Sequence, residues 1–244
     1  MWQTVRIPSF SSSSFHPNSI PAMDDRNRIT KTTIVRTHDT VLEVVYTNEE
    51  HTVEQILDKY EEWLAEEKHR FIGLDIEYTR NRQHMSVLQL AMRQHVLVFH
   101  WCKSKKNCPE LGKFFERKNI TFASMDITND SKVLSSAGFH IPPEYYVDIQ
   151  LVYKIKGGDE RDRMGDLAAD LIDKSYANMK EFPSNQHDFW EWMPLHKVNL
   201  DYAAIDGYVT YELYRKILTL KDRLRPTWQE MLCPRCKNAL GELQ

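Results

Sequence analysis

The spacing of hydrophobic and polar residues changes along the chain and predicts two kinds of element. Alternating or continuous apolar runs predict strands at residues 33–37, 41–47, 71–78, 86–92, 95–100, 120–125 and 145–149. Apolar residues at helical spacing predict helices at residues 52–63, from 109 onward, 130–137, 149–156, 164–175 and 199–220. Because strands and helices alternate after residue 71, the pattern indicates a single α/β domain.

Two local signals set the expected boundaries in the first half of the chain. Thr52, with Gln55 three residues later, has the spacing of a capping box and predicts the start of the first helix. Arg93 and Gln94 separate two apolar runs by a hairpin-length connection. We therefore expect an antiparallel strand pair around this turn.

One predicted strand, residues 71–78, carries two acids in an otherwise apolar run. Side chains alternate along a strand, so Asp75 and Glu77 point the same way, with Cα atoms about 7 Å apart. The run is typical of a buried central strand, where ionised groups are costly unless they are paired or bound to a metal. Two interpretations follow: the acids hold a hard divalent cation such as Mg²⁺, or the strand ends here and they reach solvent.

Composition limits the class of protein. The 244 residues suffice for one large α/β domain, and a formal charge of −3 provides no cationic field for a binder that relies on basic patches. No apolar run approaches the roughly 20 residues of a membrane span, so we expect no membrane partner. Four cysteines without a secretory signal indicate a reducing compartment.

The ends of the chain differ from its middle. Residues 1–31 are Ser-rich, with Arg6 and no acid before Asp24, which allows either a transit peptide or a disordered tail. The scarcity of basic residues favours the tail, and Met23 is an alternative start. We place the catalytic domain at residues 32–222 and a C-terminal tail at 223–244. Cys233 and Cys236 in that tail have the spacing of half a zinc site, but no second pair matches it, so we favour incidental cysteines.

Three further residues complete a set able to do chemistry. Tyr202 and Asp206 stand at i and i+4 of the predicted last helix and so share one face. Asp130 lies at the predicted start of another helix, where an acid is ordinarily a cap. Taken singly, each has a purely structural interpretation: a packing tyrosine, a surface acid or a helix cap.

The order of these residues resembles the proofreading-type 3′–5′ exonucleases that use three aspartates, one glutamate and a tyrosine. The segment 71–78 matches the first motif, 122–134 the second, and Trp190–Leu195 followed by Leu200–Tyr208 the third. The chain looks closest to the ribonuclease D-like branch, and within it to the Werner-syndrome exonuclease domain and its plant relatives. Asp126 is a rival for the second-motif acid, but its position, four residues too early, favours Asp130.

The resemblance implies a ribonuclease H-like mixed sheet flanked by helices, and removal of nucleoside 5′-monophosphates from the 3′ end of DNA or RNA. It implies two divalent cations, Mg²⁺ or Mn²⁺, held by Asp75, Glu77, Asp130 and Asp206, while Tyr202 orients the attacking water. The expected partner is nucleic acid, as a single strand or the 3′ end of a duplex, and a separate helicase is compatible with it. The expected location is nucleus or cytoplasm, with an organelle as the alternative if the N-terminal segment is a transit peptide. The alternative function is a non-catalytic nucleic-acid- or partner-binding module on the same fold, although the intact acids favour the enzyme.

Overall fold

The computed structural model describes residues 27–79, 84–159, 161–179, 182 and 184–224. The predicted tail up to residue 26 and the Cys233–Cys236 pair lie outside these residues, so the predictions made for them stay predictions. Within the described part, no helix is long and apolar enough to span a bilayer.

A mixed sheet forms the centre of the domain, as predicted. Its seven strands, among the described residues, lie in the order β1-β2-β5-β4-β3-β6-β7. β3 is antiparallel to β4 and parallel to β6, so it has a partner on each side. The strands are β1 (Thr30–Thr37), β2 (Thr40–Thr47), β3 (Phe71–Tyr78), β4 (Met85–Met92), β5 (His95–Phe99), β6 (Thr121–Ser124) and β7 (Tyr146–Asp148).

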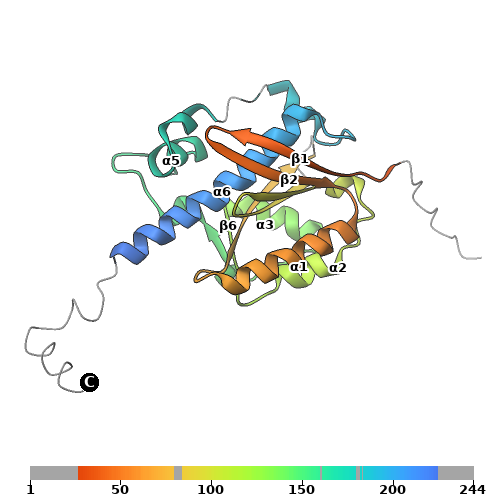
Figure 1. Ribbon diagram of the computed structural model, residues 1–244, viewed down its shortest axis with the longest axis horizontal. Coiled ribbons are helices and arrows are strands. Elements are labelled where there is room, and N and C mark those ends of the chain that lie inside the picture. The colour runs from red at the N-terminus through yellow and green to blue at the C-terminus, as the bar shows by residue number, and fades with distance from the viewer. Residues whose placement is uncertain (1–26, 80–83, 160, 180–181, 183, 225–244) are drawn as a thin grey trace, which may run out of the picture.

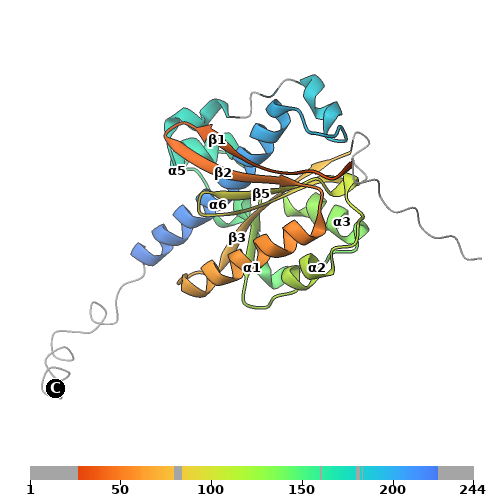
Figure 2. The same ribbon diagram turned by 45° about the vertical axis from the view of Figure 1, so that its right-hand side comes forward.

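Helices cover both faces of this sheet (Figures 1 and 2). The first face is covered by α1, α2 and α3, and the second by the long α6, which contacts β3, β4 and β5 and against which α5 packs. The arrangement confirms the predicted ribonuclease H-like class. The helices are α1 (Glu50–Glu66), α2 (Pro109–Phe115), α3 (Ile127–Ser136), α4 (Ile149–Val152), α5 (Met164–Leu171) and α6 (Lys197–Leu224).

Two apolar runs of the sequence become the central strand, β4, and its neighbour, β3. Every residue of β4 is buried, and on β3 Ile72, Leu74 and Ile76 are buried on the face away from α6. Asp75 and Glu77 alternate with them and are partly exposed. The prediction that Asp75 and Glu77 point to the same face of this strand is therefore correct.

Two glycines let α6 lie close to the sheet. A Cβ added to Gly73 of β3 would lie 2.5 Å from the backbone nitrogen of Tyr211 on α6. One added to Gly207 would lie 3.1 Å from the Cβ of Gln89 on β4. The first distance is too short for any residue with a Cβ, and the second would require Gln89 to shift. The two glycines therefore permit the close approach that brings the α6 side chains to the acids of β3.

Several predicted boundaries differ from the structure. The helices predicted at 149–156 and 164–175 end earlier, at Val152 and Leu171, and the helix predicted at 199–220 is longer, at Lys197–Leu224. α1 begins at Glu50, with Glu49 as its N-cap, and Thr52 is buried inside the helix with its hydroxyl against that of Thr30. The prediction that Thr52 caps this helix is therefore wrong. β1 begins at Thr30, within the predicted tail, because the Ile29 N–H donates to the side chain of Asn48.

α3 begins at Ile127, three residues before the predicted start at Asp130. Asp126 takes a left-handed conformation, with φ 52°, and turns the chain from β6 into the helix. Asp130 consequently lies in the first turn of α3 rather than at its cap.

Candidate active site

Three of the predicted site residues meet where α6 crosses β3. One carboxylate oxygen each from Asp75, Glu77 and Asp206 lies within 4.8 Å of the others. Asp75 and Glu77 are partly buried and Asp206 is almost fully buried, at 1% exposure. Such a group of like charges is repulsive unless positive charge or protons compensate it.

Tyr202 lies one helical turn before Asp206 on α6, as predicted. Its ring is half-buried and packs in an aromatic cluster that we define as Phe182, His187, Trp190 and Tyr202. The ring centroids of Phe182 and Tyr202 are 4.1 Å apart, and those of Trp190 and Tyr202 are 6.1 Å apart. The cluster restricts the direction in which the Tyr202 phenol can point.

The peptide segment that leads into α6 is anchored to the sheet by a buried network. The carbonyl of Trp190 accepts hydrogen bonds from Ser86 Oγ at 2.6 Å and from His100 Nε2 at 3.0 Å. Because a carbonyl only accepts, Nε2 carries the proton, and Nδ1 accepts from the Tyr46 hydroxyl at 2.8 Å. Burial lowers the pKa of His100 to about 4, so this neutral form persists at physiological pH. The network fixes one side of the aromatic cluster.

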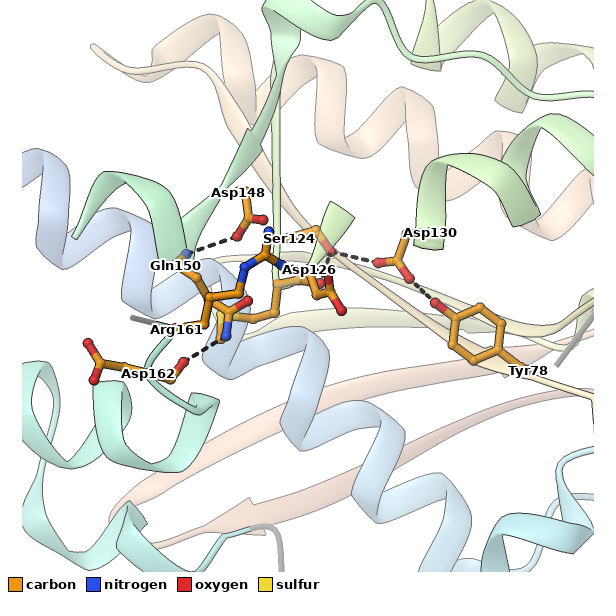
Figure 3. Close-up of polar contacts among 9 residues, drawn as sticks. Tyr78, Ser124, Asp126, Asp130, Asp148, Gln150, Arg161 and Asp162 are labelled. Atoms are coloured by element: carbon orange, nitrogen blue, oxygen red, sulfur yellow. Dashed lines mark hydrogen bonds and ion pairs between the residues drawn. The ribbon is translucent and has the colours of Figure 1, made fainter. Parts of the chain in front are cut away.

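Asp130 reaches the region from α3, on the other face of the sheet (Figure 3). It is buried, and its two carboxylate oxygens accept from the Tyr78 hydroxyl and from Ser124 Oγ, the latter at 3.0 Å. Burial raises the pKa of Asp130 to about 6, and the two hydrogen bonds oppose that rise. Asp130 is not one of the three residues whose oxygens converge.

Tyr78 connects the three-acid group with Asp130. It follows Glu77 directly at a register shift between β3 and β4, and its hydroxyl donates to Asp130. Burial raises the pKa of the Tyr78 phenol, and the nearby charges of Asp130 and Asp75 raise it further. The phenol therefore stays protonated and remains a donor.

The rival acid Asp126 points elsewhere. Its side chain is largely exposed and forms an ion pair with Arg161, with Oδ1 2.9 Å from Nη1 (Figure 3). The structure thus separates the two second-motif acids: Asp130 is buried beside Tyr78 and Ser124, and Asp126 is on the surface.

The order and geometry of these residues agree with a family match. Residues 48–221 match the 3′–5′ exonuclease domain family. The chain belongs to this family. It is accordingly a 3′–5′ exonuclease, and the five positions predicted for the site lie within the matched range. No curated protein matches the sequence significantly.

Solved structures show the same fold. The Nibbler exonuclease domain of Aedes aegypti superposes with a TM-score of 0.54 at 20% identity, over 80% of this chain and 94% of that one. RNase D of Escherichia coli gives 0.55 at 17% identity, over 70% of this chain and 44% of that one. The catalytic core of RRP6 from Trypanosoma brucei gives 0.58 at 15% identity, over 84% and 54%. The exonuclease described here thus spans about half of the last two chains.

The donor set of this exonuclease fits a hard divalent cation. Asp75, Glu77 and Asp206 supply only oxygen, from two different elements, within the span of one coordination sphere. Burial of Asp206 leaves its negative charge poorly solvated, which a bound cation would offset.

Sequence reasoning missed the partners of Asp130. Neither Ser124 nor Tyr78 was among the predicted site residues, whereas the structure shows both donating to this carboxylate. The available signal was their location at the ends of β6 and β3, two neighbouring parallel strands whose carboxyl ends meet at one edge of the sheet.

Proposed function

We propose that this exonuclease hydrolyses the terminal phosphodiester at the 3′ end of DNA or RNA with two divalent cations, Mg²⁺ or Mn²⁺, and releases nucleoside 5′-monophosphates. The observation that carries the proposal is the convergence of Asp75, Glu77 and Asp206 within 4.8 Å. Three carboxylates alone would repel a phosphodiester. A site of this kind accepts such a substrate only when cations reverse its charge.

The residues divide the work as follows. Asp75 would contribute to holding both cations, Glu77 and Asp206 would complete the first site, and Asp130 would serve the second. When bound, two such cations lower the pKa of the attacking water and stabilise the leaving oxygen. What supports this division is that Asp130 approaches from α3, on the face opposite α6, beside Tyr78 rather than within the three-acid group.

Tyr202 orients the water. A phenol has an ordinary pKa of about 10 and is a weak base at neutral pH, so its contribution is position rather than proton removal. The aromatic cluster supports this role, because Phe182 and Trp190 limit the freedom of the ring. The entropic cost of aligning the tyrosine with the attacking water is then already incurred when the protein folds.

Tyr78 and Ser124 keep Asp130 in one orientation. Each hydroxyl donates to a different oxygen of the carboxylate, so rotation of Asp130 would break both hydrogen bonds. Since both donors favour the ionised form, they counteract burial and leave Asp130 charged above about pH 6.

For the substrate we propose a single strand or the 3′ end of a duplex, and within the family we place the chain near the Werner-syndrome exonuclease domain. The support is the Trp190–Leu195 and Leu200–Tyr208 motif. RNA belongs among the substrates to test because RNase D of Escherichia coli, which shares the fold, is described as an exoribonuclease. We also propose a nuclear or cytoplasmic location and a separate helicase as partner, on the same resemblance.

Digestion of 5′-labelled DNA and RNA, single-stranded or with a recessed 3′ end, tests the proposal. With Mg²⁺ or Mn²⁺ the expected result is a ladder that shortens from the 3′ end, and with EDTA no degradation. Asp75→Ala is the matched control for a contaminating nuclease. Folded wild-type protein that leaves every substrate intact, or degrades them equally in EDTA, would refute the proposal.

A further inference from the structure

Gln89 of β4 is a buried polar side chain that has no hydrogen-bond partner in the part of the chain that the structure describes. It has 0% exposure, and neither its Nε2 nor its Oε1 finds a partner among the described residues. Leaving one buried polar atom unsatisfied typically costs about 1–3 kcal/mol, and Gln89 has two. Such an expense in the centre of a well-packed sheet calls for a functional reason.

The position of Gln89 relates it to the three-acid group. It is paired directly with Asp75 across the β3–β4 ladder, so both side chains point to the α6 face. On that face its Cβ lies against Gly207, the residue after Asp206. The amide is therefore enclosed by the two elements that supply the cation ligands.

An amide has the right chemistry for such a place. It carries two N–H donors and one acceptor oxygen, so it can hydrogen-bond to a carboxylate and to a water molecule at once. Ligating carboxylates in metal sites are commonly held by hydrogen bonds from neighbouring groups, whose loss typically costs about 10–100-fold in metal affinity or activity.

We infer that Gln89 is a positioning residue of the cation site. Its Nε2 donates to the carboxylates of Asp75 and Asp206 as they take up the cation, and its Oε1 accepts from a water bound there. The inference rests on the proposed metal-dependent function. It explains why an amide with no hydrogen-bond partner among the described residues occupies a fully buried strand of the sheet.

The test compares Gln89→Met with Thr210→Val. Methionine has nearly the shape of glutamine but no hydrogen-bonding amide. Thr210 is a matched control because it is also fully buried with an unpartnered hydroxyl, one turn beyond Asp206 on α6. Mn²⁺ affinity is measured by calorimetry without substrate, and stability by urea unfolding in EDTA.

The expected result has two opposite parts. Gln89→Met raises the urea midpoint in EDTA, because an unsatisfied polar group is removed, yet weakens Mn²⁺ binding by about 10–100-fold. Thr210→Val also raises the midpoint but leaves the Mn²⁺ affinity within twofold of wild type.

Several outcomes would overturn the inference. Unchanged Mn²⁺ affinity in Gln89→Met would mean that the amide only fills space. If Gln89→Met and the equally apolar Gln89→Leu both failed to fold, the amide would be needed by the metal-free chain, which contradicts the role proposed. If the wild-type protein degrades nucleic acid and Gln89→Met binds Mn²⁺ normally, only the inference about Gln89 is refuted. If the wild-type protein is inactive, the proposed function is refuted.

Discussion

Gly73→Ala tests whether the close packing of α6 on β3 positions the active site. The added methyl carbon would lie 2.5 Å from the backbone nitrogen of Tyr211 and 2.7 Å from its Cα. Ordinary contact begins at 3.4 Å. The obstacle is backbone rather than the end of a flexible side chain, so the helix itself must move.

The required movement is about 0.9 Å if α6 alone retreats, since a dense protein interior offers no void to absorb the methyl group. Overpacking of this kind typically costs about 1–3 kcal/mol of stability. Asp206 lies on the same helix and moves with it away from Asp75 and Glu77. Because a misplacement of about 1 Å can cost about 100-fold in rate, we expect a loss of that order in the chemical step.

Single-turnover digestion at saturating Mn²⁺ measures the rate, and urea unfolding measures the stability. Gly112→Ala on α2 is the control, because its nearest neighbour would be a Phe139 side-chain atom at 3.8 Å. It should leave the rate unchanged and keep or raise the stability by about 0.4–1 kcal/mol. A fully active Gly73→Ala enzyme would show that the approach of α6 to β3 does not set the catalytic geometry.

The remaining predictions concern the acids and the tyrosine. Asp75→Ala should abolish activity yet leave the metal-free protein as stable as wild type or slightly more so in urea, because one of three mutually repelling charges is gone; residual activity above a few per cent would contradict its role. Asp130→Asn should reduce the rate far more than Asp126→Asn, and the reverse order would show that the second motif is misaligned by one helical turn. Tyr202→Phe should slow single turnover by about 10²–10⁴-fold while Mn²⁺ and substrate still bind, and an unchanged chemical step would mean that Tyr202 only packs. In EDTA, the stability of the wild type relative to Asp130→Asn should fall as pH rises from about 4 to 6. The reason is that Asp130, with a pKa of about 6 in the folded protein, keeps its proton to a higher pH than in the unfolded chain. Equal pH profiles of the two proteins in urea unfolding would contradict this prediction.

The sequence was sufficient to predict the sheet strands and the acidic pair because both depend on local period. Alternation placed Asp75 and Glu77 on one face and Ile72, Leu74 and Ile76 on the other, as observed. Helix starts were less predictable, since they depend on tertiary contacts. The Thr52 hydroxyl, which has capping-box spacing, lies instead against Thr30 of the first strand.

The site was predictable as a set of residues but not as a geometry. The i, i+4 spacing of Tyr202 and Asp206 requires only a helix, whereas the approach of Asp206 to Asp75 requires α6 to touch the sheet at Gly73. Nothing in the local pattern marks Gly73 as a contact of Tyr211, which lies more than 130 residues away in sequence. The same holds for Gln89, whose isolation is visible only when its surroundings are known.

The placement of the acids makes folding and metal binding interdependent. β3 and α6 must be packed together before Asp75, Glu77 and Asp206 come within 4.8 Å, so the unfolded chain has no comparable site. In the metal-free protein this convergence is a cost, because like charges repel and Asp206 is buried. A cation that binds only the folded form both removes the cost and adds its own binding free energy to stability. The packing of α6 on the sheet therefore has to offset this repulsion until a cation binds. This requirement explains why α6 contacts several strands and why two glycines permit its close approach beside the site.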